Sequence, residues 1–362
     1  MTMPAKDEFW MPAEWEPHAG TWMLWPERPD NWRDNAAPAQ RAFAAVAAAI
    51  VKSESVTMGV SADFFQSARA MLPCGVRVVE ISSNDAWMRD VGPTFVVNRR
   101  RQVRGVDWIF NAWGGKAGGA YADWALDDQV AAKVLEIESK PRYRAPFILE
   151  GGAIDVDGQG TLLTTEECLL DPNRNPTLTR SKIESLLERH LGVQKIIWLG
   201  RGVFNDETDG HVDNLCCFVR PGDVVLTWCD NPEDPQYDIS HAAYEVLVRA
   251  RDARGRRLRI HKLMQPGPLY MTEAEAAGIE RSEDCKPRRC GDRLAGSYVN
   301  FYIANRHIVM PLLDARTDRA AKATLAKLFP RRKVIGVPAR EILLGGGNIH
   351  CITQQQPRDR KR

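Results

Sequence analysis

The sequence has no Cys-x-x-Cys pair, although eight cysteines are scattered through its 362 residues. Cys216 and Cys217 are adjacent, and the Cys285 to Cys290 spacing has no second pair to match it. Disulfide frameworks and structural zinc sites need paired and regularly spaced cysteines. We therefore expect neither of them, and we expect reduced thiols and a cytoplasmic location.

Long apolar runs are also missing. No stretch reaches the roughly 20 apolar residues that a membrane-spanning helix needs, and the longest candidate, residues 36–51, contains Pro38, Gln40 and Arg41. Residues 1–8 lack the apolar stretch of a secretory signal. We expect no signal peptide and no membrane partner.

A strong charge of either sign is absent, because the formal net charge is only +2. Basic clusters occur at residues 99–101, 254–259, 286–289 and 358–362. No aromatic stripe accompanies these arginines, so we interpret them as solvated hairpin tips and a disordered basic tail and expect no nucleic-acid partner. With 44% hydrophobic and 27% charged residues, the composition is that of an ordinary globular protein with a large core.

A repeated rhythm of strand, strand, helix and strand runs through most of the chain. Its clearest copy has strands at 153–156 and 161–164, a helix at 180–191 and a strand at 195–199. Similar copies begin near residues 94, 212 and 298, and the first segment fits as a looser fifth copy. A repeat of roughly 60 residues indicates a modular architecture. If five modules surround one axis, equivalent strand ends meet in the middle, where we expect the chemistry.

We interpret the rest of the chain as a scaffold that presents one segment, residues 345–357. This segment begins with Gly345-Gly346-Gly347, and Cys351 follows four residues after the last glycine. We expect an apolar strand to end at Leu344. Glycines let a substrate approach the backbone, and a thiolate is a strong nucleophile near neutral pH. The plain alternative is that Cys351 is a small buried hydrophobe, as lone cysteines often are.

Three further polar motifs precede Cys351 at intervals of about 60 residues. They contain Asp90, Glu150 and the pair His211 and Asp213. Residues two apart share one face of a strand, so we expect the side chains of this pair to point the same way. The even spacing predicts that all four groups converge.

Each of these residues also has a plain structural explanation. Asp90 precedes Gly92-Pro93 and suits a turn, and Glu150 could pair with a surface arginine. His211 and Asp213 could form a structural pair or bind a metal. A cysteine and three carboxylates around one histidine suit a nucleophile and an organic cation better than a metal, so we expect no metal and no other cofactor.

These motifs predict an anionic cavity, because they contain several carboxylates and Arg89 is their one cation. A planar guanidinium presents its donors in a rigid fork that two carboxylates can clamp. Cys351 would then attack the electron-poor central carbon while His211 moves protons. The expected partner is a small cationic guanidino compound.

The motifs of the chain resemble those of the agmatine deiminases, which belong to the guanidino-group-modifying pentein superfamily and to the bacterial peptidylarginine-deiminase-like family. The resemblance rests on the segments at 11–18, 87–94, 110–115, 149–152, 206–214, 265–271 and 345–355. It implies a five-bladed pseudo-symmetric α/β propeller of ββαβ modules around a central active site. It implies one catalytic domain over residues 1–362, ordered from about 11 to 357. The implied reaction is hydrolysis of agmatine to N-carbamoylputrescine and ammonia.

The resemblance also implies a role for each residue. Cys351 matches the nucleophile, His211 the general acid and base, and Glu150 the carboxylate that orients the histidine. Asp90 and Asp213 match the guanidinium clamp, and Trp87 is expected to flank the substrate.

The chain departs from the family pattern at some positions. Ala153 and Asp155 replace a serine and a histidine that usually follow Glu150-Gly151-Gly152, and Pro338 is also unusual. These departures leave open a deiminase or amidinotransferase acting on another guanidino compound, such as arginine or peptidyl-arginine. A guanidine-binding scaffold without activity is the alternative outside enzymes. The oligomeric state, homo-oligomer included, and the choice between polyamine synthesis and agmatine breakdown also stay open.

Overall fold

Five of the six sheets in the computed structural model, which describes residues 3–359, share one plan. In each of them one strand pairs antiparallel with one neighbour and parallel with the other. Antiparallel neighbours need only a tight turn, whereas parallel neighbours need a crossover, usually a helix. The strand, strand, helix and strand rhythm of the sequence is therefore confirmed as the building unit of a mixed α/β fold.

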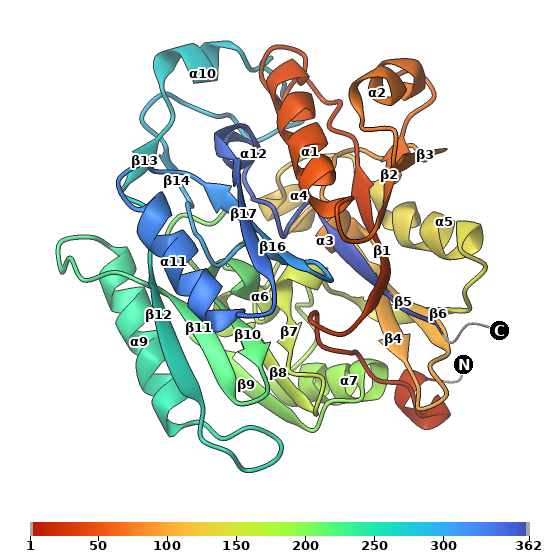
Figure 1. Ribbon diagram of the computed structural model, residues 1–362, viewed down its shortest axis with the longest axis vertical. Coiled ribbons are helices and arrows are strands. Elements are labelled where there is room, and N and C mark those ends of the chain that lie inside the picture. The colour runs from red at the N-terminus through yellow and green to blue at the C-terminus, as the bar shows by residue number, and fades with distance from the viewer. Residues whose placement is uncertain (1–2, 360–362) are drawn as a thin grey trace.

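Four of these units are continuous in sequence. The first two comprise β4 (Thr94–Val97), β5 (Val103–Ile109), α5 (Val130–Ile137) and β6 (Arg142–Ile148), then β7 (Asp155–Val156), β8 (Thr161–Thr165), α7 (Arg180–Leu191) and β9 (Lys195–Leu199). The next two comprise β10 (Cys216–Arg220), β11 (Asp223–Trp228), α9 (Gln236–Arg249) and β12 (Arg259–Met264), then β15 (Tyr302–Ile303), β16 (His307–Leu312), α11 (Asp318–Leu328) and β17 (Lys333–Pro338). Figure 1 shows α5, α7 and α9 at the periphery and the short strands β7 and β10 nearer the middle.

The fifth unit joins the two ends of the chain. Its sheet has the order β18-β1-β2-β3, and β18, close to the C-terminus, pairs antiparallel with β1. The first segment looked irregular in sequence because its missing strand lies more than 300 residues later. The elements of this unit are β1 (His18–Leu24), α1 (Ala37–Ile50), β2 (Ser55–Val60), α2 (Phe65–Met71), β3 (Val76–Glu80) and β18 (Gln354–Pro357).

Helix α7 shows why these sequences form these elements. The side chain of Thr179 accepts a hydrogen bond from the backbone of Lys182 at the start of the helix, and Gly192 ends it in the left-handed conformation. Ile183, Leu187 and Leu191 recur every four residues and are buried, which gives the helix one apolar face. Middle strands such as β8 and β11 are buried along their whole length, as expected of strands covered on both faces.

The remaining elements are short and join these units. They are η1 (Pro4–Asp7), α3 (Met88–Val91), α4 (Gly115–Gly118), η2 (Asp127–Gln129), η3 (Gly151–Ala153), α6 (Glu166–Leu169), α8 (Val212–Leu215), β13 (Leu269–Tyr270), α10 (Glu273–Ala277), β14 (Arg293–Leu294) and α12 (Arg340–Leu344). Among the described residues, no helix is both long enough and apolar enough to cross a membrane.

Two expected strands are wrong. The strand expected from Val212 begins at Cys216, because α8 takes the first four residues. The apolar residues Leu343 and Leu344 end α12 instead of a strand. Both segments are short and buried, and a short apolar run does not distinguish a strand from a buried helical turn.

The ends of the chain differ from expectation in one respect. Residues 3–10 are folded, since they include η1 and since Trp10 forms an isolated antiparallel bridge with Val97. Of the basic tail, Arg358 donates its backbone N–H to Pro17, and Asp359 pairs with Lys140 at 2.7 Å. The disorder expected for residues 360–362 lies outside the described residues.

Candidate active site

One rule places the chemically interesting side chains. In all five sheets they lie directly before the first antiparallel strand of the unit. Asp90 precedes β4, Glu150 precedes β7, His211 and Asp213 precede β10, Asn300 precedes β15, and Cys351 precedes β18. The structure therefore brings equivalent points of five units to one place, and it adds Asn300 to the set expected from sequence.

Cys351 lies at the bottom of this cluster and is 2% exposed. Its Sγ is 3.6 Å from Asp213 Oδ2 and accepts a hydrogen bond of 3.2 Å from Asn300 Nδ2. A Cβ atom at Gly347 would come within 2.5 Å of the Trp87 ring and 3.1 Å of Cys351 Cβ. The glycine is needed here because the backbone passes this close to the Trp87 ring and to the Cβ atom that carries the thiol.

Gly152 marks the point where three of the expected residues meet. A Cβ atom there would lie 2.5 Å from His211 Nδ1, 2.9 Å from Asp90 Oδ1 and 3.1 Å from Asp213 Oδ2. The backbone N–H of Gly152 also donates to Asp90 Oδ1 at 2.9 Å. The convergence expected from the spacing is present, although His211 and Asp213 reach it from the start of α8 and not from one face of a strand.

His211 is fully buried between two carboxylates. Its Nδ1 is 3.8 Å from Asp90 Oδ1, and its Nε2 is 3.7 Å from Glu150 Oε2. Neither nitrogen has a partner at hydrogen-bond distance among the described residues. Burial opposes the charged ring, but the negative charge of Asp90 and the neighbouring Cys168 and Glu150 side chains outweigh it and hold the pKa of His211 well above its usual value.

The three carboxylates of the site differ in their pKa values. Burial, together with the charges of Asp213 and Glu150, raises the pKa of Asp90 to about 6, and His211 offsets only part of this rise. Burial also acts on Glu150, but the charges of Arg174 and His211 lower its pKa to about 2. For Asp213 the hydrogen bond and charge of His350 outweigh burial and lower the pKa. Glu150 and Asp213 are thus firmly anionic, whereas Asp90 titrates close to neutral pH.

Arg174 is the buried cation that the sequence did not reveal. Its Nε lies 3.0 Å from Glu150 Oε1 and 3.2 Å from Glu150 Oε2, and its Nη1 lies 3.1 Å from Asp209 Oδ2. Arg89, the cation present in the motifs, contacts Gln355 and Glu14 instead. The cavity is therefore anionic, and the positive charge of Arg174 partly compensates the negative charge of its carboxylates.

Tryptophans form the apolar wall of the site. Trp87 donates to Asp85 Oδ2 at 2.9 Å, and its ring lies edge-to-face with Trp113 at 6.4 Å. Trp113 donates to Asp90 Oδ2 at 3.0 Å, which fixes the carboxylate. Both indoles and Tyr121 line the cavity above Cys351. Trp87, expected to flank the substrate, thus lies in the cavity wall, and Trp113 was not among the residues expected from sequence.

Cys168 brings a third potential metal ligand near His211. Atoms of Glu150, Cys168 and His211 lie within 4.8 Å of one another and are buried. Metal cations do bind such groups, but the Arg174 guanidinium already pairs with Glu150 at 3.0 Å. A divalent ion would face this fixed positive charge, so these residues fit a metal poorly.

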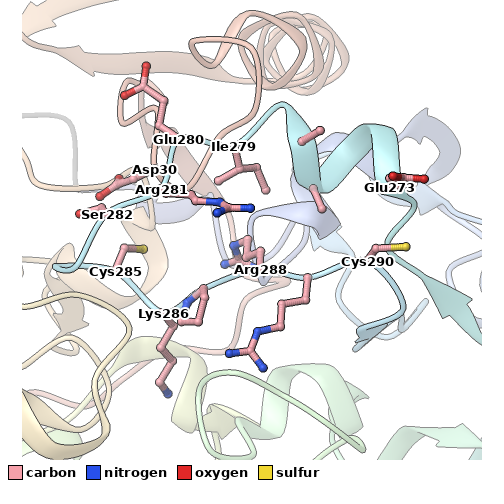
Figure 2. A pocket seen from close by; sticks show the side chains of 14 residues that line it. Asp30, Glu273, Ile279, Glu280, Arg281, Ser282, Cys285, Lys286, Arg288 and Cys290 are labelled. Atoms are coloured by element: carbon pink, nitrogen blue, oxygen red, sulfur yellow. The ribbon is translucent and has the colours of Figure 1, made fainter.

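Arg288 lies at the entrance of the cavity. From the sequence it was expected in a solvated basic cluster, which is wrong for this residue. It donates to Gly345 O at 2.6 Å and to Asn31 Oδ1 at 2.8 Å, and it pairs with Glu207 at 2.5 Å. The space left over Cys351 is only about 20 Å³, room for about one water molecule. A larger outer cavity of about 760 Å³ shares Arg288, Lys286 and Cys285 with this space as lining residues. Figure 2 shows the side chains that line the outer cavity.

Comparisons with known proteins agree with this geometry. The chain is 60% identical over 356 residues to the agmatine deiminase of Stutzerimonas stutzeri, covering 98% of this chain and 97% of that protein. It is 59% identical over 360 residues to the agmatine deiminase of Pseudomonas aeruginosa, covering 99% and 98%.

Solved structures give the same result. The agmatine deiminase of Enterococcus faecalis, described as catalysing its reaction, superposes with a TM-score of 0.96 at 46% identity and covers 99% of this chain and 98% of that one. A cysteine-to-serine variant of the agmatine deiminase of C. jejuni, with substrate bound, superposes with a TM-score of 0.84 at 26% identity, over 98% and 97% of the two chains. The sequence profile of the Porphyromonas-type peptidyl-arginine deiminases matches residues 10–357, and the chain belongs to this family.

Proposed function

We propose that this protein is an agmatine deiminase that hydrolyses agmatine to N-carbamoylputrescine and ammonia through a covalent amidino adduct on Cys351. The observation that carries the proposal is the position of the Cys351 thiol, 3.6 Å from Asp213 Oδ2, in a cluster with Asp90 and His211 around Gly152. The names of the relatives at about 60% identity over nearly the full chain support the substrate.

Asp90 and Asp213 bind the guanidinium in this proposal. Asp213 Oδ1 is buried without a hydrogen-bond partner among the described residues, so it can accept a guanidinium N–H. Trp113 and Gly152 hold both oxygens of Asp90 from the side. A flat cation between these carboxylates would lie against the indole of Trp87, where the ring face attracts positive charge.

The chemistry then takes two steps. The Cys351 thiolate adds to the guanidinium carbon, the C–N bond to one terminal nitrogen breaks, and His211 gives that nitrogen a proton so that it leaves as ammonia. In the second step His211 takes a proton from water, the resulting hydroxide attacks the amidino carbon, and the C–S bond breaks. As this bond breaks, the new hydroxyl gives its proton to solvent water, N-carbamoylputrescine leaves, and the thiolate of Cys351 is restored.

Substrate binding is expected to help ionise the thiol. Burial and the charges of Asp213 and Asp90 hold the pKa of Cys351 well above its usual value, so the thiol is neutral in the free protein. A guanidinium bound between the two carboxylates cancels their charge and favours the thiolate. Glu150 orients His211 and stabilises its charged form.

The five units form, in our proposal, one five-bladed α/β propeller with this site on its axis, as a single catalytic domain. The placement of the site residues before the first antiparallel strand of every unit supports it, as does the antiparallel pairing of β18 with β1, which joins the chain ends in one sheet.

A panel of guanidino compounds tests the activity. We expect ammonia release from agmatine to exceed that from arginine and peptidyl-arginine. The carboxylate of arginine needs a cation near Cys351, but Arg288 is already paired with Glu207, and Lys286, the other cation of the lining, also borders the outer cavity. Faster turnover of arginine or of a peptide would refute the substrate and leave the guanidine chemistry standing. Amidino transfer to an added amine without net hydrolysis would identify a transferase instead.

A further inference from the structure

His350, the neighbour of the proposed nucleophile, is held between two acids. Its Nδ1 lies 2.8 Å from Asp213 Oδ2, and its Nε2 lies 2.8 Å from Glu14 Oε2. The side chain is almost fully buried. Nothing in the sequence motifs pointed to a role for this ring beyond its place before Cys351.

The geometry fixes the protonation state of the ring. An ionised carboxylate only accepts hydrogen bonds, and a neutral imidazole carries a single N–H. Two short contacts to two carboxylates therefore require hydrogen on both nitrogens, which makes His350 an imidazolium. Its backbone N–H donates to Asn300 Oδ1 at 2.9 Å, so the ring is anchored from the main chain as well.

Charged groups from four segments face this ring: Glu14, Arg89 of α3, Asp155 of β7 and Asp213 of α8. Burial and the charge of Arg89 oppose the imidazolium, but Glu14 and Asp213 outweigh them and raise the pKa of His350 to about 9. Burial also acts on Glu14, but His350 and Arg89 lower its pKa to about 2. Burial raises the pKa of Asp155 to about 8, so Asp155 is largely neutral at pH 7 and adds little charge. Cys217 also lies in the small cavity beside the ring.

The two oxygens of Asp213 are thus used differently. Oδ2 is taken by His350, whereas Oδ1 is buried without a partner among the described residues. Oδ2 is also the oxygen that lies 3.6 Å from Cys351 Sγ, so the contact with His350 fixes the carboxylate relative to the thiol. The hydrogen bonds of Asp90 come from the uncharged Trp113 and Gly152 instead, and burial raises its pKa to about 6.

We propose that His350 is a positioning residue for substrate binding: held between Glu14 and Asp213, it fixes Asp213 Oδ2, the oxygen that lies 3.6 Å from Cys351 Sγ, so that this carboxylate is held in place for the guanidinium. Glu14, from the segment before β1, thereby belongs to the same apparatus. The inference rests on the proposed function, because it takes Asp213 as part of the guanidinium clamp.

Binding measurements on the non-reactive Cys351→Ser protein test this inference. Calorimetry should give a dissociation constant for agmatine that rises about 10- to 100-fold when His350→Gln is added, as expected for loss of a charged hydrogen-bond partner. In the protein with Cys351 intact, the same change should raise KM more than it lowers kcat. Glu14→Gln keeps the shape of the contact and should weaken binding less.

The pH dependence separates positioning from simple stabilisation. In the parent, agmatine binding should weaken as the pH rises through about 9, where His350 loses its proton. This limb should vanish in His350→Gln. It should move to lower pH in Glu14→Gln, because the negative charge that raises the pKa of His350 is gone.

Glu54→Gln is the matched control, since Glu54 is also a buried carboxylate beside a histidine, His18, at 3.0 Å. It should lower the melting temperature without changing agmatine affinity. If His350→Gln leaves affinity and its pH dependence unchanged, or if Glu54→Gln weakens binding equally, the inference is wrong. Asp213→Asn separates a failure of this inference from a failure of the proposed function. If this variant binds agmatine normally, the proposed guanidinium clamp itself is wrong.

Discussion

Gly152 lies so close to His211 that a methyl group in its place would come within 2.5 Å of His211 Nδ1. The same methyl group would reach the oxygens of Asp90 and Asp213. The glycine therefore keeps open the space in which a histidine and two carboxylates face one another.

Gly152→Ala should consequently abolish most of the activity. The clash forces His211 or Asp90 away from the site, and misplacement of a reacting group by about 1 Å can cost on the order of 100-fold in rate. Steady-state kinetics with agmatine checks this loss. Gly200→Ala is the matched control, because a Cβ atom at Gly200 meets nothing within 4 Å, and it should keep full activity.

The acid limb of the pH profile should report Asp90. Burial raises the pKa of Asp90 to about 6, so kcat/KM for agmatine should fall as the pH drops through about 6 and the carboxylate that holds the guanidinium becomes neutral. The hydrogen bond from Trp113 to Asp90 Oδ2 favours the ionised carboxylate. Trp113→Phe removes this bond, so it should raise the pKa of Asp90 and shift the limb to higher pH. A limb that stays in place in this variant would show that another group controls it.

Arg174 should matter for stability as well as for activity. Arg174→Met leaves the Glu150 carboxylate buried without its ion-pair partner, and breaking a buried pair in this way costs about 3–5 kcal/mol. Urea denaturation measures the loss. Adding Glu150→Gln should restore much of the stability, because the uncompensated charge is gone, but it should not restore activity. A stable single variant would mean that Glu150 does not depend on Arg174.

The sequence was sufficient for the repeat and for the residues in its motifs. Asp90, Glu150 and His211 lie at matching points of successive units, so regular spacing alone predicted that they converge. Helix α7 was predicted with its bounds because a capping threonine and a left-handed glycine mark its ends. The looser fifth unit could be completed only in three dimensions, by the pairing of β18 with β1.

The residues that were missed act through contacts that leave no local signal. Arg174 lies in an ordinary loop, yet its guanidinium reaches Glu150. Asn300 fell inside the strand expected to begin near residue 298, whereas the structure has that strand only at Tyr302–Ile303. Arg288 belongs to a basic cluster typical of solvated loops, but acceptors from three distant segments bury it.

The covalent adduct on Cys351 is the most direct test of the whole account. The protein would be mixed with agmatine, quenched in acid within one turnover and digested, and the peptide that carries Cys351 would be measured by mass spectrometry. The account predicts an added amidino group, still bearing the aminobutyl chain of agmatine, on that peptide, and the adduct should disappear as agmatine is exhausted. With Cys351→Ser it predicts no adduct, and ammonia release several powers of ten below the parent. Agmatine turnover at an undiminished rate by Cys351→Ser would contradict it.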